Sequence, residues 1–291
     1  MDKEKFSGIF TALLTPFDKN NKINEKELER LVKFNLKKGV TGFYVGGSTA
    51  EAFFLSLDER KQIMDVVKDA APESTLIAHI GAQDERVARE LGAYANKLSY
   101  DLISSVTPFY YKFSVEEIRN YYLRLCDASG MRMLMYYFPN FSGVSMGADV
   151  IESFLGDDRF AGMKFTANDF FTLERCKTKY PDKIVYNGFD EMLLSGLCMG
   201  ADGGIGSTYN FMADKFVNIV KYFKEGDIKR AQDEQREANR IIEVLCKVGV
   251  MQAEKEVLNQ LGFDFGVCRE PFASPTDEQK ALIAKEIIPF I

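Results

Sequence analysis

A lysine ends a short apolar segment of this sequence, a position from which it could form a covalent bond to a substrate. Lys164 follows residues 160–163 (FAGM), which read as a strand. A free lysine amine has a pKa of about 10.4, so at neutral pH it is protonated and cannot attack a carbonyl. Burial disfavours the ammonium form, which is how Schiff-base lysines become nucleophilic. Alternatively, the lysine only packs its stem there while its amine reaches water.

Two tyrosines end a second apolar segment and could supply proton transfer. The segment reads MLMYYFP, and Pro139 ends the strand. Because side chains alternate along a strand, only one of Tyr136 and Tyr137 should face the interior. A phenol close to Lys164 could carry the proton that an amine and a carbonyl substrate exchange. The alternative is an ordinary core tyrosine.

The segment GGSTAEAF contains groups suited to an anion. Its two glycines allow close backbone approach, and Ser48 and Thr49 add hydroxyl and amide donors before a helical turn. We expect this loop to bind a carboxylate. A simple helix cap by Ser or Thr is the alternative.

Two further segments carry groups that could bind a polyol. YNGFDEM contains Asp190 and Glu191, whose carboxylates can accept hydrogen bonds from vicinal hydroxyls or simply form an acidic first helical turn. GADGGIGSTYN exposes Ser207. This second segment could be a phosphate loop, but no basic residue lies close to it.

The elements that must position these groups alternate between strand and helix. Strands are predicted at 8–13, 42–45, 76–80, 102–105, 132–136, 162–164, 184–186 and 203–205. Helices are predicted at 25–37, 57–70, 84–97, 115–128, 148–155, 169–180, 191–199 and 212–224. Eight such repeats in about 220 residues indicate an α/β fold, the (β/α)8 TIM barrel, whose active sites lie at the carboxyl ends of the strands.

The last part of the chain has helical periodicity without further strands. It is helical from 227 to about 261, turns at Pro271 and Pro275, and is expected to end with a helix at 277–287. No flexible linker precedes it. We therefore divide the chain into a barrel of residues 1–224 that carries the active site and a C-terminal helical extension of residues 225–291 packed on it.

Composition narrows the classes of function. The net charge is −6 and the 37 basic residues are scattered, which argues against nucleic-acid binding. No apolar segment is long enough for a membrane helix or a signal peptide, so we expect a cytoplasmic protein that binds small molecules. The single histidine, His79, cannot build a metal site of several imidazoles and reads as a core residue. The five cysteines lack CxxC spacing and read as buried thiols.

The motifs GGSTAEAF, YYFP, MKFT, YNGFDE and GADGGIGSTYN resemble, in order and spacing, the dihydrodipicolinate synthase / N-acetylneuraminate lyase family of pyruvate-dependent class I aldolases. The resemblance covers residues 8 to about 272. It implies that Lys164 is the Schiff-base lysine and Tyr136 the proton-transfer residue. It also implies binding of the 2-keto acid carboxylate by Ser48 and Thr49, and of the sugar end by Thr166, Gly188, Asp190, Glu191 and Ser207.

Three further expectations follow from the resemblance. Tyr110 would reach into the site of a neighbouring subunit in a homotetramer. No cofactor or metal would be needed, since the substrate is held covalently on Lys164. The reaction would be retro-aldol cleavage of N-acetylneuraminate to N-acetylmannosamine and pyruvate, so the partners would be a sugar acid and pyruvate.

Some alternatives remain open at this point. The protein could be an aldolase for another 2-keto-3-deoxy sugar acid, a dihydrodipicolinate synthase, or a barrel that binds a sugar acid without catalysis. In the synthases an arginine follows the strand-end tyrosine by five residues, whereas this sequence has Phe141 there. Ala50 replaces the second glycine of the usual GSTGE loop, and would be strained if a positive φ were required there.

Overall fold

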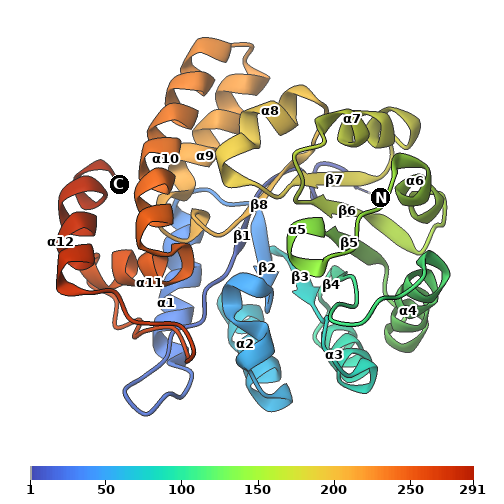
Figure 1. Cartoon of the computed structure of the whole chain (residues 1–291), viewed down its shortest axis with the longest axis horizontal. Helices are drawn as coiled ribbons and strands as arrows, with labels where there is room; N and C mark the ends of the chain where they lie inside the picture. The colour runs from blue at the N-terminus through green and yellow to red at the C-terminus, as the bar shows by residue number, and fades with distance from the viewer. Residues whose placement is uncertain (1) are drawn as a thin grey trace.

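The eight strands close into one parallel barrel, which confirms the predicted fold (Figure 1). The structure is a computed structural model that describes residues 2–291. Strands adjacent in the sequence pair with each other, and β1 pairs with β8. The strands are β1 Gly8–Ala12, β2 Gly42–Val45, β3 Thr75–His79, β4 Leu102–Val106, β5 Met133–Tyr137, β6 Phe160–Phe165, β7 Ile184–Asn187 and β8 Gly203–Gly206.

Helices follow the strands and surround the barrel. They are α1 Glu25–Lys37, α2 Leu57–Ala70, α3 Glu85–Lys97, α4 Val115–Ser129, α5 Pro139–Ser142, α6 Ala148–Leu155, α7 Phe170–Lys179, α8 Leu193–Cys198 and α9 Tyr209–Lys224. Short 3-10 turns lie at η1 Ser48–Ala50, η2 Ala52–Phe54 and η3 Asp190–Met192. Several helix starts are set by polar caps; for example, Ser56 and Glu59 form a capping box that begins α2.

The structure differs from the helical predictions in three places. The helix expected at 191–199 is split into η3 and α8. The helix expected at 212–224 begins earlier, at Tyr209, and is kinked at Met212, where φ is −127° and ψ is 37°. The short helix α5 was not predicted, because a single turn of four residues shows no helical periodicity.

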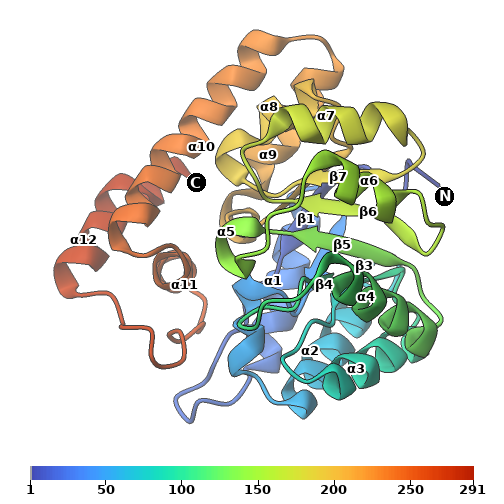
Figure 2. The ribbon, with the colours of Figure 1, turned by 45° about the vertical axis from the view of Figure 1, so that its right-hand side comes forward.

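The C-terminal extension stands beside the barrel and packs through α10 on α9. Its elements are α10 Ile228–Val248, α11 Val250–Gln260, α12 Asp277–Glu286 and η4 Ile288–Phe290. Gly249 separates α10 from α11. Its φ is 114°, a backbone conformation that residues other than glycine rarely adopt. In Figure 2, α11 and α5 lie at the same end of the barrel, and the N-terminus lies at the opposite side.

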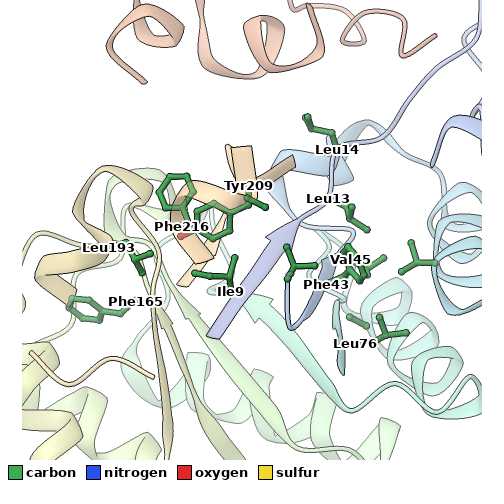
Figure 3. Packing of buried hydrophobic residues seen from close by; sticks show 14 of the residues in the cluster. Ile9, Leu13, Leu14, Phe43, Val45, Leu76, Phe165, Leu193, Tyr209 and Phe216 are labelled. Carbon is green, nitrogen blue, oxygen red and sulfur yellow. The ribbon is translucent and has the colours of Figure 1, made fainter. Parts of the chain in front are cut away.

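Alternation along the strands divides the core into two layers. The outer layer fills the space between strands and helices, and Figure 3 shows Ile9, Phe43 and Val45 from the strands in this layer with Tyr209 and Phe216 from α9. The inner layer fills the barrel itself. Its buried members are Phe6, Phe10, Ala12, Tyr44, Ile77, Leu102, Val106, Leu134, Tyr136, Ala161, Ile184, Tyr186 and Ile205.

Two composition-based expectations can be compared with the described residues. None of their helices combines the length and apolarity that a membrane crossing requires. Their five cysteines are all free. The interpretation of all five as buried thiols is wrong for Cys198 and Cys246, since both side chains lie on solvent-facing positions of helices α8 and α10.

Candidate active site

Lys164 and Tyr136 face each other on neighbouring strands inside the barrel. They are register partners in the β5–β6 ladder. The Lys164 Nζ atom lies 4.3 Å from the centre of the Tyr136 ring and 4.9 Å from the centre of the Tyr44 ring. Tyr137 points to the outer layer, where its hydroxyl donates to the Met146 carbonyl at 3.2 Å. Of the two strand-end tyrosines, Tyr136 is therefore the one that can act on a group bound to Lys164.

The amine of Lys164 is buried without a counter-ion. The residue is 6% exposed, and its Nζ makes no hydrogen bond or ion pair with any residue from 2 to 291. Burial lowers its pKa from 10.5 to about 8, although the Asp190 carboxylate opposes this shift. The alternative of an amine extended into water is therefore wrong. At pH 7 roughly a tenth of such amines would be uncharged.

The Tyr136 phenol is held protonated by its surroundings. Burial raises its pKa well above the ordinary value of a phenol, while the nearby hydroxyls of Thr166 and Ser48 oppose this rise. Phe138 stacks on the ring with centroids 5.8 Å apart. In the free protein this phenol is therefore a proton donor. A positive charge formed on Lys164 would lower its pKa and allow it to accept a proton.

The GGSTAEAF loop brings the Ser48 hydroxyl next to the Tyr136 phenol. Ser48 is exposed, Thr49 is partly buried, and no side-chain cap bond begins η1, so the cap alternative is not what the structure has. Ala50 does not have a positive φ. The left-handed conformation falls instead on Glu51, with φ 58° and ψ 34°. The strain considered for Ala50 therefore does not arise.

Glu51 anchors this loop to the C-terminal extension. Its carboxylate is buried, with Oε1 2.5 Å from the Lys255 Nζ in α11. Its other oxygen, Oε2, accepts a hydrogen bond from the Arg269 backbone N–H at 2.7 Å. Glu51, two positions after Thr49, is thus fixed by groups more than 200 positions later in the chain.

Thr166, Gly188 and Asp190 line the inner wall next to Lys164. The Thr166 Oγ1 atom is buried, and among residues 2–291 the Tyr136 phenol lies near it without a hydrogen bond of ordinary geometry. A Cβ atom on Gly188 would lie 1.9 Å from Thr166 Oγ1, so only glycine fits there. The Asp190 Oδ2 atom accepts hydrogen bonds from the Thr208 backbone N–H at 2.9 Å and from its hydroxyl at 2.7 Å. Burial raises the Asp190 pKa to about 6.

The other predicted residues lie farther out. Glu191 is exposed in η3. Ser207 is partly buried and donates a hydrogen bond from Oγ to Glu254 Oε1 at 2.6 Å. Tyr110 is 84% exposed and has a φ of 79°, and the one aromatic ring that it contacts among the described residues is Tyr111, edge to face with ring centroids 5.0 Å apart. Within one chain, Tyr110 is therefore not brought into contact with the other candidate residues.

An apolar cavity of about 250 Å³ opens beside the reactive pair. Its lining includes Ser48, Phe53, Phe109, Phe138, Phe141 and Met251. Lys164 does not line this cavity. Its amine lies beside the Tyr136 ring, and Phe138, which stacks on the same ring, forms part of the cavity wall. Phe141 is 79% exposed, so the mouth has an apolar ring where a synthase would have an arginine.

Two residues near the site, Tyr44 and Glu254, were not predicted from the sequence, whereas the prediction for His79 is confirmed. Alternation with Phe43 along β2 would place Tyr44 inside, but the sequence carries no signal for Glu254. His79 is a satisfied core residue, as predicted: Nδ1 pairs with the Gly46 carbonyl at 2.9 Å, and burial lowers its pKa to about 3. Within the described chain, no group of three or more His, Cys, Asp or Glu side chains is arranged for a metal ion.

This chain is similar to known proteins over nearly its whole length. The sequence matches the dihydrodipicolinate synthetase family over residues 5–288. It is 43% identical to N-acetylneuraminate lyase of Escherichia coli (strain SMS-3-5 / SECEC) over 275 residues, covering 94% of this chain and 92% of the relative.

Two solved structures are also similar over nearly the whole chain. CdNal from Clostridium difficile in complex with mannosamine superposes with a TM-score of 0.95 at 39% identity, covering 98% of this chain and 99% of its own. N-acetylneuraminate lyase from Fusobacterium nucleatum complexed with pyruvate gives a TM-score of 0.91 at 37% identity, covering 97% and 98%. This chain belongs to the dihydrodipicolinate synthetase family.

Proposed function

We propose that this protein is a class I aldolase that cleaves N-acetylneuraminate to N-acetylmannosamine and pyruvate through a Schiff base on Lys164. The observation that carries the proposal is a buried amine without a counter-ion, 4.3 Å from the ring of a protonated phenol. The names of the relatives support the substrate, since they are N-acetylneuraminate lyases.

The reaction follows from the Lys164–Tyr136 pair. The uncharged amine attacks the C2 ketone of the open-chain sugar acid, and Tyr136 donates the proton with which the C2 hydroxyl leaves as water. The iminium then draws electrons as the C3–C4 bond breaks, and the Tyr136 phenolate accepts the proton of the C4 hydroxyl. Tyr136 returns this proton to C3 of the pyruvate enamine, and water releases pyruvate from Lys164. Every step uses side chains of the protein, so the proposal needs no cofactor or metal.

The two ends of the substrate would be held by different walls of the site. Ser48 and Thr49 would bind the carboxylate, since both lie in the turn that follows β2 and the Ser48 hydroxyl lies next to the Tyr136 phenol. The hydroxylated tail would contact the opposite wall. We assign it to Thr166, Gly188, Asp190, Glu191 and Ser207, of which Thr166 has a buried hydroxyl without a hydrogen bond of ordinary geometry among the described residues.

The division of the chain and its assembly belong to the same proposal. Residues 1–224 would carry the reacting groups, and residues 225–291 would form an extension that supports them. Tyr110 would complete the site of a neighbouring subunit in a homotetramer, which its 84% exposure supports. A cytoplasmic location and a role in sialic acid catabolism stay predictions that accompany this activity.

Borohydride reduction in the presence of pyruvate is the decisive experiment. We expect one pyruvate adduct per chain, on the peptide that contains Lys164, together with release of pyruvate from N-acetylneuraminate. An adduct on another lysine would contradict the assignment. Cleavage assays on a panel of 2-keto-3-deoxy sugar acids, and a synthase assay, would separate the related activities. The apolar Phe141 disfavours the synthase, whose second substrate carries a carboxylate.

A further inference from the structure

A buried acid of the C-terminal extension contacts the sugar-side wall of the candidate site. Glu254 lies in α11 and is 0% exposed. Its Oε1 atom accepts a hydrogen bond from the Ser207 hydroxyl at 2.6 Å, across 47 positions of the sequence. Its other oxygen, Oε2, is buried without a hydrogen-bond partner among residues 2–291. A fully buried acid with one oxygen unused is costly to keep, which calls for a functional explanation.

No cation among residues 2–291 forms an ion pair with Glu254. The next residue, Lys255, forms an ion pair with Glu51 instead, with Nζ 2.5 Å from Oε1. The charged or titratable groups that face Glu254 are Asp190 of η3, which raises its pKa further, and the thiol of Cys268 in the C-terminal loop. Burial raises the Glu254 pKa to about 8, so near pH 7 the side chain is mainly a neutral acid. Its carbonyl oxygen can accept from Ser207 without adding a charge beside Asp190.

The Ser207–Thr208 segment is consequently held from two sides. Glu254 accepts the single hydrogen bond that the Ser207 hydroxyl can donate, while Asp190 accepts hydrogen bonds from both the backbone N–H and the hydroxyl of Thr208. With its proton directed to Glu254, the Ser207 oxygen can present only lone pairs to a ligand. A hydroxyl of a polyol, which can donate, suits such an oxygen. A carboxylate or phosphate, which can only accept, does not.

We propose that Glu254 is a positioning residue that orients the Ser207 hydroxyl as an acceptor for the polyol end of the sugar acid. The inference rests on the proposed function and extends it, because it assigns the C-terminal extension a part in choosing the substrate. Glu254 acts through Ser207 and does not touch the reacting carbons.

The test compares Glu254→Gln and Glu254→Ala with a matched control, Glu243→Gln, which removes an exposed acid of α10. In Glu254→Ala the KM for N-acetylneuraminate should rise roughly tenfold, the effect of one lost buried hydrogen bond. The rate of pyruvate trapping by borohydride should stay within about twofold of wild type, since the pyruvate end does not contact Ser207. Glu254→Gln keeps a carbonyl acceptor, and its KM at pH 7 should stay within about threefold of wild type.

Two readouts separate orientation of Ser207 from a merely structural role. In a Ser207→Ala background, Glu254→Ala should change KM by less than about twofold, because the partner of Glu254 is already gone. Between pH 7 and 9 the KM of wild type should rise as Glu254 ionises next to Asp190, while the KM of Glu254→Gln should not follow this step. If Glu254→Ala does not fold, the pH profile of Glu254→Gln decides the question.

The outcomes that would overturn the inference are distinct from failure of the proposed function. Wild-type turnover with an unchanged KM in Glu254→Ala would overturn the inference alone. The inference would also be overturned if the effects of Glu254→Ala and Ser207→Ala on KM were fully additive. A loss of pyruvate trapping in Glu254→Ala as large as its rise in KM would overturn it as well. Wild-type protein that forms no pyruvate adduct and cleaves no sialic acid would overturn the proposed function, and this inference with it.

Discussion

Two buried lysines of this molecule have opposite surroundings. Lys164 in β6 and Lys255 in α11 are 6% and 1% exposed. The Lys255 amine lies 2.5 Å from the Glu51 carboxylate and donates to the Val267 carbonyl at 3.2 Å. The Lys164 amine has aromatic rings beside it and no such partner among the described residues. Burial lowers the pKa of both amines and a carboxylate opposes this in each case, but Glu51 contacts the Lys255 amine directly, whereas Asp190 forms no ion pair with Lys164 among the described residues.

This difference shows that burial alone does not make a lysine nucleophilic. A buried ammonium that is paired stays an ammonium and holds two segments together. A buried amine that is unpaired gives up its proton more easily and becomes available for a carbonyl. The predictions below test whether this difference in partners separates the reactive from the structural lysine.

The largest effect is expected from Lys164→Ala. Turnover should fall by roughly 10⁴-fold or more, because no other described amine can form the imine. Pyruvate trapped by borohydride should disappear from the digest, as measured by mass spectrometry. Lys255→Met serves as the matched control and should retain the adduct at Lys164. A pyruvate adduct that persists in Lys164→Ala would show that another lysine forms the imine.

Removal of the phenol should slow the reaction without preventing imine formation. Tyr136→Phe keeps the ring beside Lys164 but cannot transfer a proton, so kcat should fall by about 10²–10⁴-fold. Borohydride trapping should still label Lys164, although more slowly. Tyr137→Phe is the natural control, since this residue points to the outer layer and bonds Met146. Equal losses in both variants would contradict the assignment of Tyr136.

The stabilities of the two lysine variants should change in opposite directions. Lys255→Met leaves Glu51 buried without its cation and should lower the free energy of unfolding by about 3–5 kcal/mol. Lys164→Met replaces an unpaired amine with an apolar chain and should leave this free energy unchanged or raise it. Chemical denaturation of both variants measures the difference. Comparable destabilisation by the two substitutions would mean that pairing is not what distinguishes them.

The pH dependence of imine formation should report the Lys164 amine. Its pKa is lowered to about 8, so the uncharged fraction increases with pH up to that value and then levels off. The trapping rate should therefore rise about tenfold from pH 6 to pH 7 and be nearly flat above pH 9. An amine with an ordinary pKa would instead continue to gain rate beyond pH 9, which is the result that would refute the shift.

The smallest effect is expected on the sugar side. Asp190→Asn keeps an acceptor for Thr208 but removes the carboxylate charge, so the KM for N-acetylneuraminate should rise roughly tenfold. Pyruvate trapping should change less than this, because Asp190 affects Lys164 only through space. Steady-state kinetics and trapping on the same preparation give both values. If Asp190→Asn reduced the rate of pyruvate trapping more than the affinity for the sugar acid, Asp190 would have to be assigned to the pyruvate end of the site.

Much of this organisation could be predicted from local sequence. Period-two and helical patterns predicted eight strand–helix repeats, and the end of β6 placed Lys164 beside the end of β5. The errors fall where local signals are weak. The split between η3 and α8, and the kink at Met212, depend on contacts around Asp190 and Tyr209 that no periodicity encodes.

The sequence by itself determined the barrel, the strands that carry Lys164 and Tyr136, and the inside–outside alternation of Tyr136 and Tyr137, because these follow from residue spacing along single elements. Only the tertiary structure decided which tyrosine faces inward, which of the two buried lysines forms an ion pair, and that Glu254 reaches Ser207. The physical reason is that a pKa and a hydrogen bond depend on distances through space. Glu51 meets Lys255, and Ser207 meets Glu254, only after the C-terminal extension has packed on the barrel.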